Sequence, residues 1–186
     1  MKQSHSVLAI FIGLTLTLHQ SLSAQEDRTA NKLFYSELGG PGVIMSANFD
    51  SRFSSNERLG FGYRLGVGFG VGMVKTTWVD RQWNYTYVES IRQSYYSFPA
   101  GLNYIFGKTN SAHTFEVGAG VTFLTQKVPL YYLEKQKPGH AIGFVTFMYR
   151  LMPEDGGFSF RIGFTPVIGT SGDLYPVGAI GFGYAF

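Results

Sequence analysis

Apolar residues alternate with small or polar residues, with a period of two, along most of the chain. In the clearest run, between Leu59 and Gly72, every odd position is apolar or aromatic and every even position is glycine except Arg64. A β-strand places successive side chains on opposite faces, whereas a helix would scatter both kinds around its axis. So many glycines would also penalise a helix heavily. The pattern therefore predicts strands with two chemically different faces.

Seven clear runs of this kind follow one another, with turn residues between them. The predicted strands cover residues 43–53, 58–75, about 88–107, 113–126, 140–151, 157–169 and 175–186. Short and long connections alternate, as in an up-and-down barrel with tight turns at one rim and loops at the other. Since bacterial membrane barrels made from one chain have even strand numbers, residues 33–39 are predicted to form a weak eighth strand. The alternative is seven strands, with residues 33–42 as a plug or a strand extension.

The side chains on the two faces differ in total volume, and this difference indicates which face lies inside the barrel. The bulky faces carry more large apolar and aromatic side chains than the lumen of an eight-stranded barrel can hold. Turned outward, they form an apolar band, while the small and polar residues suit a narrow interior. The predicted fold class is therefore all-β, a closed antiparallel up-and-down transmembrane β-barrel of eight strands. A soluble lipocalin-like binding barrel, with the faces reversed, is an alternative.

The first part of the chain has the features of a secretory signal peptide, predicted for residues 1–24. Lys2 supplies the positive charge, residues 7–18 are apolar, and small residues precede the predicted cleavage site. Residues 25–32 are predicted to be a flexible segment, and residues 33–186 the barrel domain. The net charge of +3 and the absence of cysteine give no ground for a nucleic-acid partner, a disulfide framework or cysteine-ligated metal.

No catalytic, cofactor or metal site is predicted. Two of the four histidines lie in the leader, and His113 and His140 belong to opposite rims, where they cannot form one site. The glycine-rich run lies inside a strand rather than at a strand-to-helix turn, which argues against a nucleotide-binding loop. We therefore expect a non-enzymatic protein without a cofactor, with a structural or surface-interaction role.

Charged residues recur on the polar faces of alternate predicted strands, at similar heights and with alternating sign. They are Glu37, Arg64, Glu116 and Arg161. An unpaired charge in a barrel interior is unfavourable, so these residues are predicted to form one ion-pair layer in the lumen. Separate pairs or solvated charges in a wet lumen are the alternative. The inward glycines leave a further alternative function, a narrow pore or small-ligand transport through a Gly-lined lumen.

Two of the longer predicted loops are rich in aromatic or basic residues. The first, residues 77–87, carries Trp78, Trp83 and Tyr85, which are interpreted as an outer aromatic girdle or as a surface recognition patch. The second, residues 126–140, carries Lys135 and Lys137. These cations either pair with anionic lipopolysaccharide headgroups or keep the loop soluble.

The closing segment, residues 177–186, resembles the C-terminal assembly signal of outer-membrane barrels. The residues that match are Ile180, Gly181, Phe182, Tyr184 and Phe186. The rest of the chain is similar in size and pattern to small OmpA/OmpX-type barrels. Residues 37–40, 99–104 and 160–166 look like segments of small outer-membrane proteins of Bacteroidota. The resemblance implies a location in the outer membrane of a Gram-negative bacterium, reached through the periplasm, with outer-membrane lipid and the barrel-assembly machinery as partners.

Overall fold

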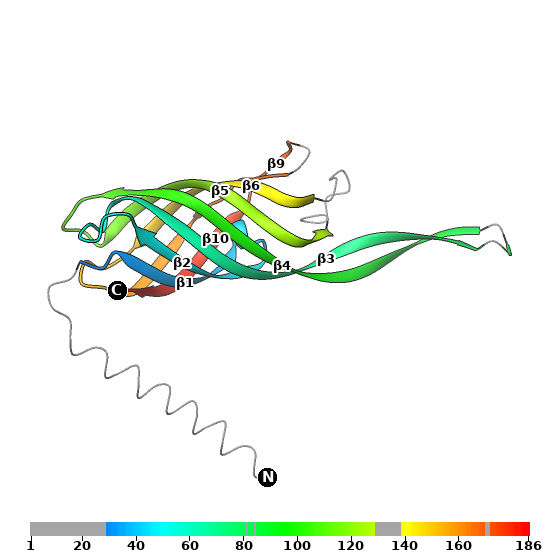
Figure 1. Ribbon diagram of the computed structural model, residues 1–186, viewed down its shortest axis with the longest axis horizontal. Coiled ribbons are helices and arrows are strands. Elements are labelled where there is room, and N and C mark those ends of the chain that lie inside the picture. Colours follow the sequence, from blue (N-terminus) through cyan, green and yellow to red (C-terminus); the bar gives the residue numbers. More distant parts are fainter. Residues whose placement is uncertain (1–28, 81, 84, 129–138, 170–171) are drawn as a thin grey trace, which may run out of the picture.

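The strands of this protein close into an antiparallel barrel, shown in Figure 1. The computed structural model describes residues 29–80, 82–83, 85–128, 139–169 and 172–186. The strands are β1 (Lys32–Gly39), β2 (Met45–Arg52), β3 (Gly60–Asp80), β4 (Tyr85–Gly107), β5 (His113–Val128), β6 (Gly139–Leu151), β7 (Gly157–Phe164), β8 (Val167–Ile168), β9 (Leu174–Tyr175) and β10 (Gly178–Ala185). The strands β1 to β7 pair in chain order, β10 pairs with β7, and β1 pairs with β10 to close the barrel. Within the described residues, no helix is long and apolar enough to cross a bilayer.

The predicted fold class is confirmed for the barrel itself. Ten strands form one sheet, and the two-residue strands β8 and β9 only extend it, which leaves eight barrel strands. The predicted weak strand is real, because β1 lies between β2 and β10 and pairs with both over nearly its whole length. We call the end that carries Lys32 and Phe186 the terminal rim, and the opposite end the far rim.

The residues after β1 fold into the lumen rather than over the far rim. Gly40–Gly42 form a short 3-10 turn, η2, and Val43 after it is buried with a φ of 77°. The hydroxyls of Ser97 and Thr122 donate to the carbonyls of Gly42 and Pro41, at 2.9 and 2.8 Å. A positive φ is strained for a β-branched residue, and these contacts hold it in place. The plug alternative, given for residues 33–42, is thus right for η2 but wrong for the strand before it. The strand predicted for residues 43–53 begins only at Met45, because Val43 is buried after η2.

The two faces of each strand lie as the alternation predicts. On β3, Phe61 and Leu65 point outward and are 65% and 52% exposed, whereas Arg64 between them is 1% exposed. The same contrast holds on the other barrel strands, where apolar rings face out and polar groups face in. The outer wall is therefore apolar, and the lumen holds the charges.

A long two-stranded arm replaces the predicted loop at residues 77–87, which is a correction. β3 and β4 continue beyond the far rim, paired from Met73↔Arg92 to Asp80↔Tyr85, and project away from the barrel in Figure 1. Trp78 and Tyr85 therefore lie in strands, and Trp83 lies in the turn between them. The segment is rich in Thr, Val, Trp and Tyr, which favour extended backbone. We call residues 73–80 and 85–92 the arm.

Two predicted strands are shorter than expected because prolines interrupt them. Pro166 separates β7 from β8, and Pro176 separates β9 from β10. Proline has no backbone N–H to donate to the ladder. β8 nevertheless keeps the register of β7 on β6, so the wall of the barrel continues past the break.

Part of the segment predicted to be flexible is fixed at the terminal rim. The amide of Ala30 donates to the carbonyl of Glu154 at 2.9 Å, and the side chain of Asn31 donates to two carbonyls of the β2–β3 turn. Lys32 already belongs to β1 and exchanges backbone hydrogen bonds with Phe186. The prediction of a loose segment is therefore wrong for residues 30–32. Residues 1–28, with the predicted signal peptide, lie outside the described residues.

Candidate functional site

The charged residues of four alternate strands meet in the middle of the lumen. Glu37 on β1, Arg64 on β3, Glu116 on β5 and Arg161 on β7 are each 1% exposed. Arg64 lies 2.8 Å from Glu37 and 4.0 Å from Glu116. Arg161 lies 3.1 Å from Glu116 and 3.5 Å from Glu37. Each arginine thus contacts both glutamates, and the structure brings all four predicted residues into one ring.

The intervening strands extend this ring into a larger network that the sequence reasoning missed. Arg150 on β6 lies 2.8 Å from Glu116 and 3.5 Å from Asp50 on β2. Arg52 contacts Asp50 and the side-chain oxygen of Asn103, both at 2.6 Å, and the amide of Asn103 donates to Asp50. These four residues sit at inward positions of their strands, so the alternation pattern contains the signal that would have found them.

The network contains more positive than negative side chains, since its four arginines face three carboxylates. Aromatic rings lie against two of these arginines. The guanidinium carbon of Arg161 is 4.3 Å from the ring centre of Tyr35, and that of Arg64 is 5.7 Å from the ring centre of Phe144. In a desolvated setting each such cation–π contact is favourable by about 1–2 kcal/mol. The rings therefore offset part of the cost of burying the extra positive charge.

Apolar side chains seal the charged layer at both ends. The cluster near the far rim consists of Val43, Tyr95, Leu124, Ile142, Phe144 and Val167. The cluster near the terminal rim consists of Ala30, Leu33, Tyr35, Met152 and Ala185. The charged layer between them is shielded from bulk water, and an unbalanced charge there is costly.

The inward glycines make room for large side chains of neighbouring strands. A Cβ atom added to Gly120 would lie 2.5 Å from Cζ of Phe144. One added to Gly181 would lie 2.8 Å from Cγ of Arg161. The space that glycines leave on the lumen face is thus taken up at these positions, which removes the main support for a Gly-lined channel.

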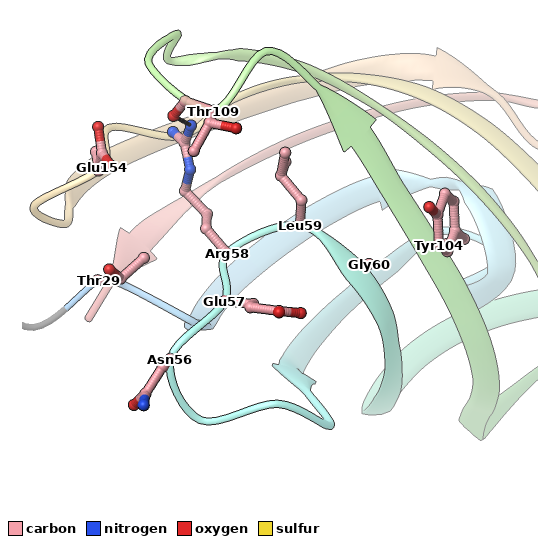
Figure 2. Close-up of a pocket in the computed structure, with 9 residues that line it drawn as sticks. All are labelled: Thr29, Asn56, Glu57, Arg58, Leu59, Gly60, Tyr104, Thr109 and Glu154. Carbon is pink, nitrogen blue, oxygen red and sulfur yellow. Dashed lines mark hydrogen bonds between the residues drawn. The ribbon is translucent and has the colours of Figure 1, made fainter.

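A pocket of about 380 Å³ opens at the terminal rim, shown in Figure 2. The residues that line the pocket include Glu57, Glu154 and Arg58. Arg58 is buried and donates to the carbonyls of Met152, Thr109 and Ser111 at 2.6, 2.8 and 2.9 Å. Because the guanidinium already donates hydrogen bonds to three backbone carbonyls, we interpret Arg58 as a structural link between three rim turns. We do not interpret it as a ligand-binding group.

Replacing Arg58 with methionine is expected to destabilise the barrel. The change leaves three backbone carbonyls without their charged donor, which corresponds to a loss of about 2–3 kcal/mol in the free energy of unfolding. Urea titration of the folded protein in detergent, followed by gel mobility, measures this loss. The matched control is Lys108→Met on the neighbouring turn, where the side chain is exposed, and it should leave the midpoint within error of wild type. An equal effect of both changes would contradict the proposed link.

The two histidines among the described residues contact different partners and lie far apart along the barrel. His113 contacts the hydroxyl of Tyr149 at 2.6 Å, and His140 contacts the carbonyl of Leu124 at 3.0 Å. They lie at opposite ends of the β5–β6 ladder, as predicted. No group of three or more His, Asp or Glu side chains able to hold a metal ion occurs among the described residues.

Most of the residues in the predicted assembly signal lie at the outer surface, and Gly181 faces the lumen. On β10, Phe182 and Tyr184 face outward, each 48% exposed, and Gly181 faces the lumen. Phe186 follows β10 and is 52% exposed, while Ile180 shares its outward parity. The second basic segment, with Lys135 and Lys137, is not among the described residues. No protein family, curated protein or solved structure was found to match this chain.

Proposed function

We propose that this protein is an integral β-barrel of an outer membrane, with a structural or surface-interaction role and no enzymatic activity. The supporting observation is that the barrel is apolar outside and charged inside. Leu65, Leu102 and Phe147 are 52%, 59% and 51% exposed on the outer wall, whereas the arginines and carboxylates of the lumen are buried. Water-soluble barrels have the reverse arrangement, because they bury their apolar face.

The extent of the apolar wall also supports a membrane location. Exposed large apolar side chains occur on every barrel strand, from β1 through β7 and on β10. Soluble monomers rarely expose a contiguous apolar patch of more than a few hundred Å². A band that encircles a barrel is best covered by the hydrocarbon of a bilayer.

The packed lumen favours a structural or surface role over transport. The largest fully buried side chains include Arg64, Arg150, Arg161, Tyr35 and Phe144, all of which fill the lumen. An ion-pair layer between two apolar clusters leaves little room for a solute to pass. The arm, which projects beyond the far rim, is the element best placed to contact other molecules (Figure 1). In an outer membrane with its terminal rim toward the periplasm, the arm faces outward, where lipopolysaccharide is the nearest partner.

Placing an arginine at the middle of the outer wall tests the membrane location. Leu65 lies midway between Phe61 and Phe69 on β3, and all three are exposed. In a bilayer, Leu65→Arg is expected to lower the free energy of unfolding by about 2–4 kcal/mol, because a cation at the midplane is costly. The measurement is urea unfolding of the protein folded in lipid vesicles.

The matched control is Val79→Arg, which adds the same charge at an exposed position of the arm, beyond the barrel. It should leave stability nearly unchanged. Wild-type protein should also fractionate with membranes after a carbonate wash and require detergent for extraction. Extraction in plain buffer, together with a Leu65→Arg variant as stable as the control, would instead favour the soluble barrel.

A further inference from the structure

The ladder between β4 and β5 ends at the far rim, while β4 continues into the arm (Figure 1). The last regular backbone pair of this ladder is Ser97 with Leu124. At the next position a side chain replaces the backbone partner. The hydroxyl of Thr125 accepts from the amide of Tyr96 at 3.0 Å and donates to its carbonyl at 3.4 Å. Within the described residues, β4 then pairs only with β3, so the arm has an edge along β4 that no other strand covers.

The contacts of Tyr96 also show which backbone groups of β4 point toward this edge. Its N–H and C=O both face β5, and successive residues of a strand direct these groups to opposite sides. Residues at even positions of β4 therefore direct both groups to the side that becomes the free edge in the arm. These residues are Thr86, Val88, Ser90 and Arg92. Their edge-facing amides and carbonyls have no backbone partner in the described part of the chain.

The features that usually protect a free sheet edge are missing from this one. Natural proteins block such edges with prolines, bulges or charged side chains. The register between β3 and β4 is regular along the whole arm, and no proline lies within it. The carboxylate of Glu89 accepts a hydrogen bond from Nε1 of Trp78 on β3 at 3.1 Å, so this charge is held toward β3. Among the edge-facing residues of β4, only Arg92 at the base of the arm is charged.

The face of β4 that continues the lumen side of the barrel adds an apolar surface beside the edge. Tyr85, Tyr87 and Ile91 lie on this face and are 65%, 47% and 43% exposed. Trp78 on β3 lies directly opposite Tyr87. A strand added along β4 would lie beside these side chains, as cross-strand neighbours do in a sheet. The edge thus offers backbone hydrogen bonds, and the face offers apolar contacts, to the same partner.

We propose that the β4 edge of the arm, residues 85–92, binds an extended segment of a partner protein by strand addition. The inference rests on the proposed surface-interaction role and names the class of partner. An extended polypeptide matches a row of alternating N–H and C=O groups in register, whereas a lipid or a saccharide does not. Every second residue of the partner segment should be apolar, to pack beside Tyr85, Tyr87 and Ile91. A second copy in the same membrane would present its own β4 in parallel orientation, which is the less stable pairing, so a different protein is the better occupant.

Peptide binding to a proline variant of the edge tests this proposal. The probe is a fluorescent peptide of about ten residues, which spans the arm, in which valine alternates with threonine between charged ends. Its binding to the folded protein in detergent is measured by fluorescence anisotropy. Val88→Pro removes an N–H that faces the edge but no hydrogen bond between β3 and β4, and proline is tolerated at such positions. It should weaken binding of the peptide about fivefold or more, as expected for the loss of one backbone hydrogen bond.

The matched control is the same substitution on the other edge of the arm. Val79 on β3 is 61% exposed, against 60% for Val88. It pairs with Thr86, whose N–H and C=O face the β4 edge, so those of Val79 face the β3 edge. Val79→Pro therefore also leaves the hydrogen bonds between β3 and β4 intact, and it should bind the peptide like wild type. An equal loss in both variants, unchanged binding by Val88→Pro, or no binding by wild type would overturn the proposal.

Two further measurements separate the other occupants and the proposed function. Dimers of wild-type protein in analytical ultracentrifugation that Val88→Pro abolishes would assign the edge to a second copy and overturn the choice of a different protein. Displacement of the peptide by lipopolysaccharide would overturn the choice of a polypeptide. The peptide assay in detergent is independent of membrane fractionation. Protein that fractionates with membranes but does not bind the peptide rejects only this inference, and protein that binds the peptide but is extracted in plain buffer rejects only the membrane location.

Discussion

Replacing Glu116 with glutamine is expected to lose most of the folded barrel. Glu116 lies within 4.0 Å of Arg64, Arg150 and Arg161, and all four side chains are buried. The variant keeps the shape of the side chain but leaves four arginines facing two carboxylates. Breaking a buried ion pair on one side costs about 3–5 kcal/mol, because the remaining charge is uncompensated. Refolding from urea into detergent micelles, scored by gel mobility before and after heating, measures the loss.

Two further variants show whether the loss comes from charge balance. Glu57→Gln removes an exposed carboxylate at the terminal rim and should refold like wild type. Adding Arg161→Met to Glu116→Gln removes one of the stranded cations and should recover part of the yield, because an apolar replacement of a buried pair is often tolerated. A Glu116→Gln variant as stable as wild type would mean that the lumen charges are solvated, which was the alternative reading of the sequence.

The inward orientation of the four ring residues could be predicted from the sequence. Which face a residue occupies, and how far it lies from the rim, follow from its position within its own strand. Glu37, Arg64, Glu116 and Arg161 each follow from counting positions in a run of alternating residues. The other residues of the network also lie at inward positions of their strands, but their contacts run across the lumen between strands. Whether Arg150 reaches Asp50 depends on the tilt and stagger of the strands, which no single run of residues specifies.

Other features depend on contacts that the sequence does not display. The η2 turn enters the lumen because the hydroxyls of Ser97 and Thr122, far away in the chain, donate hydrogen bonds to the carbonyls of Gly42 and Pro41. The sequence predicts a loop in place of the arm because charged and aromatic residues interrupt the apolar alternation there. Once β3 and β4 leave the barrel, neither face is covered by the wall or the lumen, so the two-faced pattern that marks a barrel strand is lost. Pro166 and Pro176 are visible in the sequence, and each marks a break in a strand, because proline has no backbone N–H for the ladder.

Two roles are predicted for Gly181, and one substitution separates them. The resemblance to assembly signals predicts that this glycine takes part in recognition by the insertion machinery, whereas the structure places it against Arg161. A Cβ atom at position 181 would lie 2.8 Å from Cγ of Arg161 and 3.1 Å from the carbonyl oxygen of Ser36. Gly181→Val should therefore push Arg161 away from Glu116. Overpacking alone costs about 1–3 kcal/mol, and the strained ion pair adds to it.

The decisive measurement is refolding of purified Gly181→Val in detergent, where no assembly machinery is present. We expect a clear loss of stability there, with Gly178→Val on the same strand as the matched control. Gly178 is exposed, and a Cβ atom at that position would find only the carbonyl oxygen of Gly163, at 3.9 Å. The control should stay within about 0.5 kcal/mol of wild type, as surface changes usually do. Normal refolding of Gly181→Val in detergent, combined with poor assembly in cells, would assign this glycine to the signal and not to the packing of Arg161.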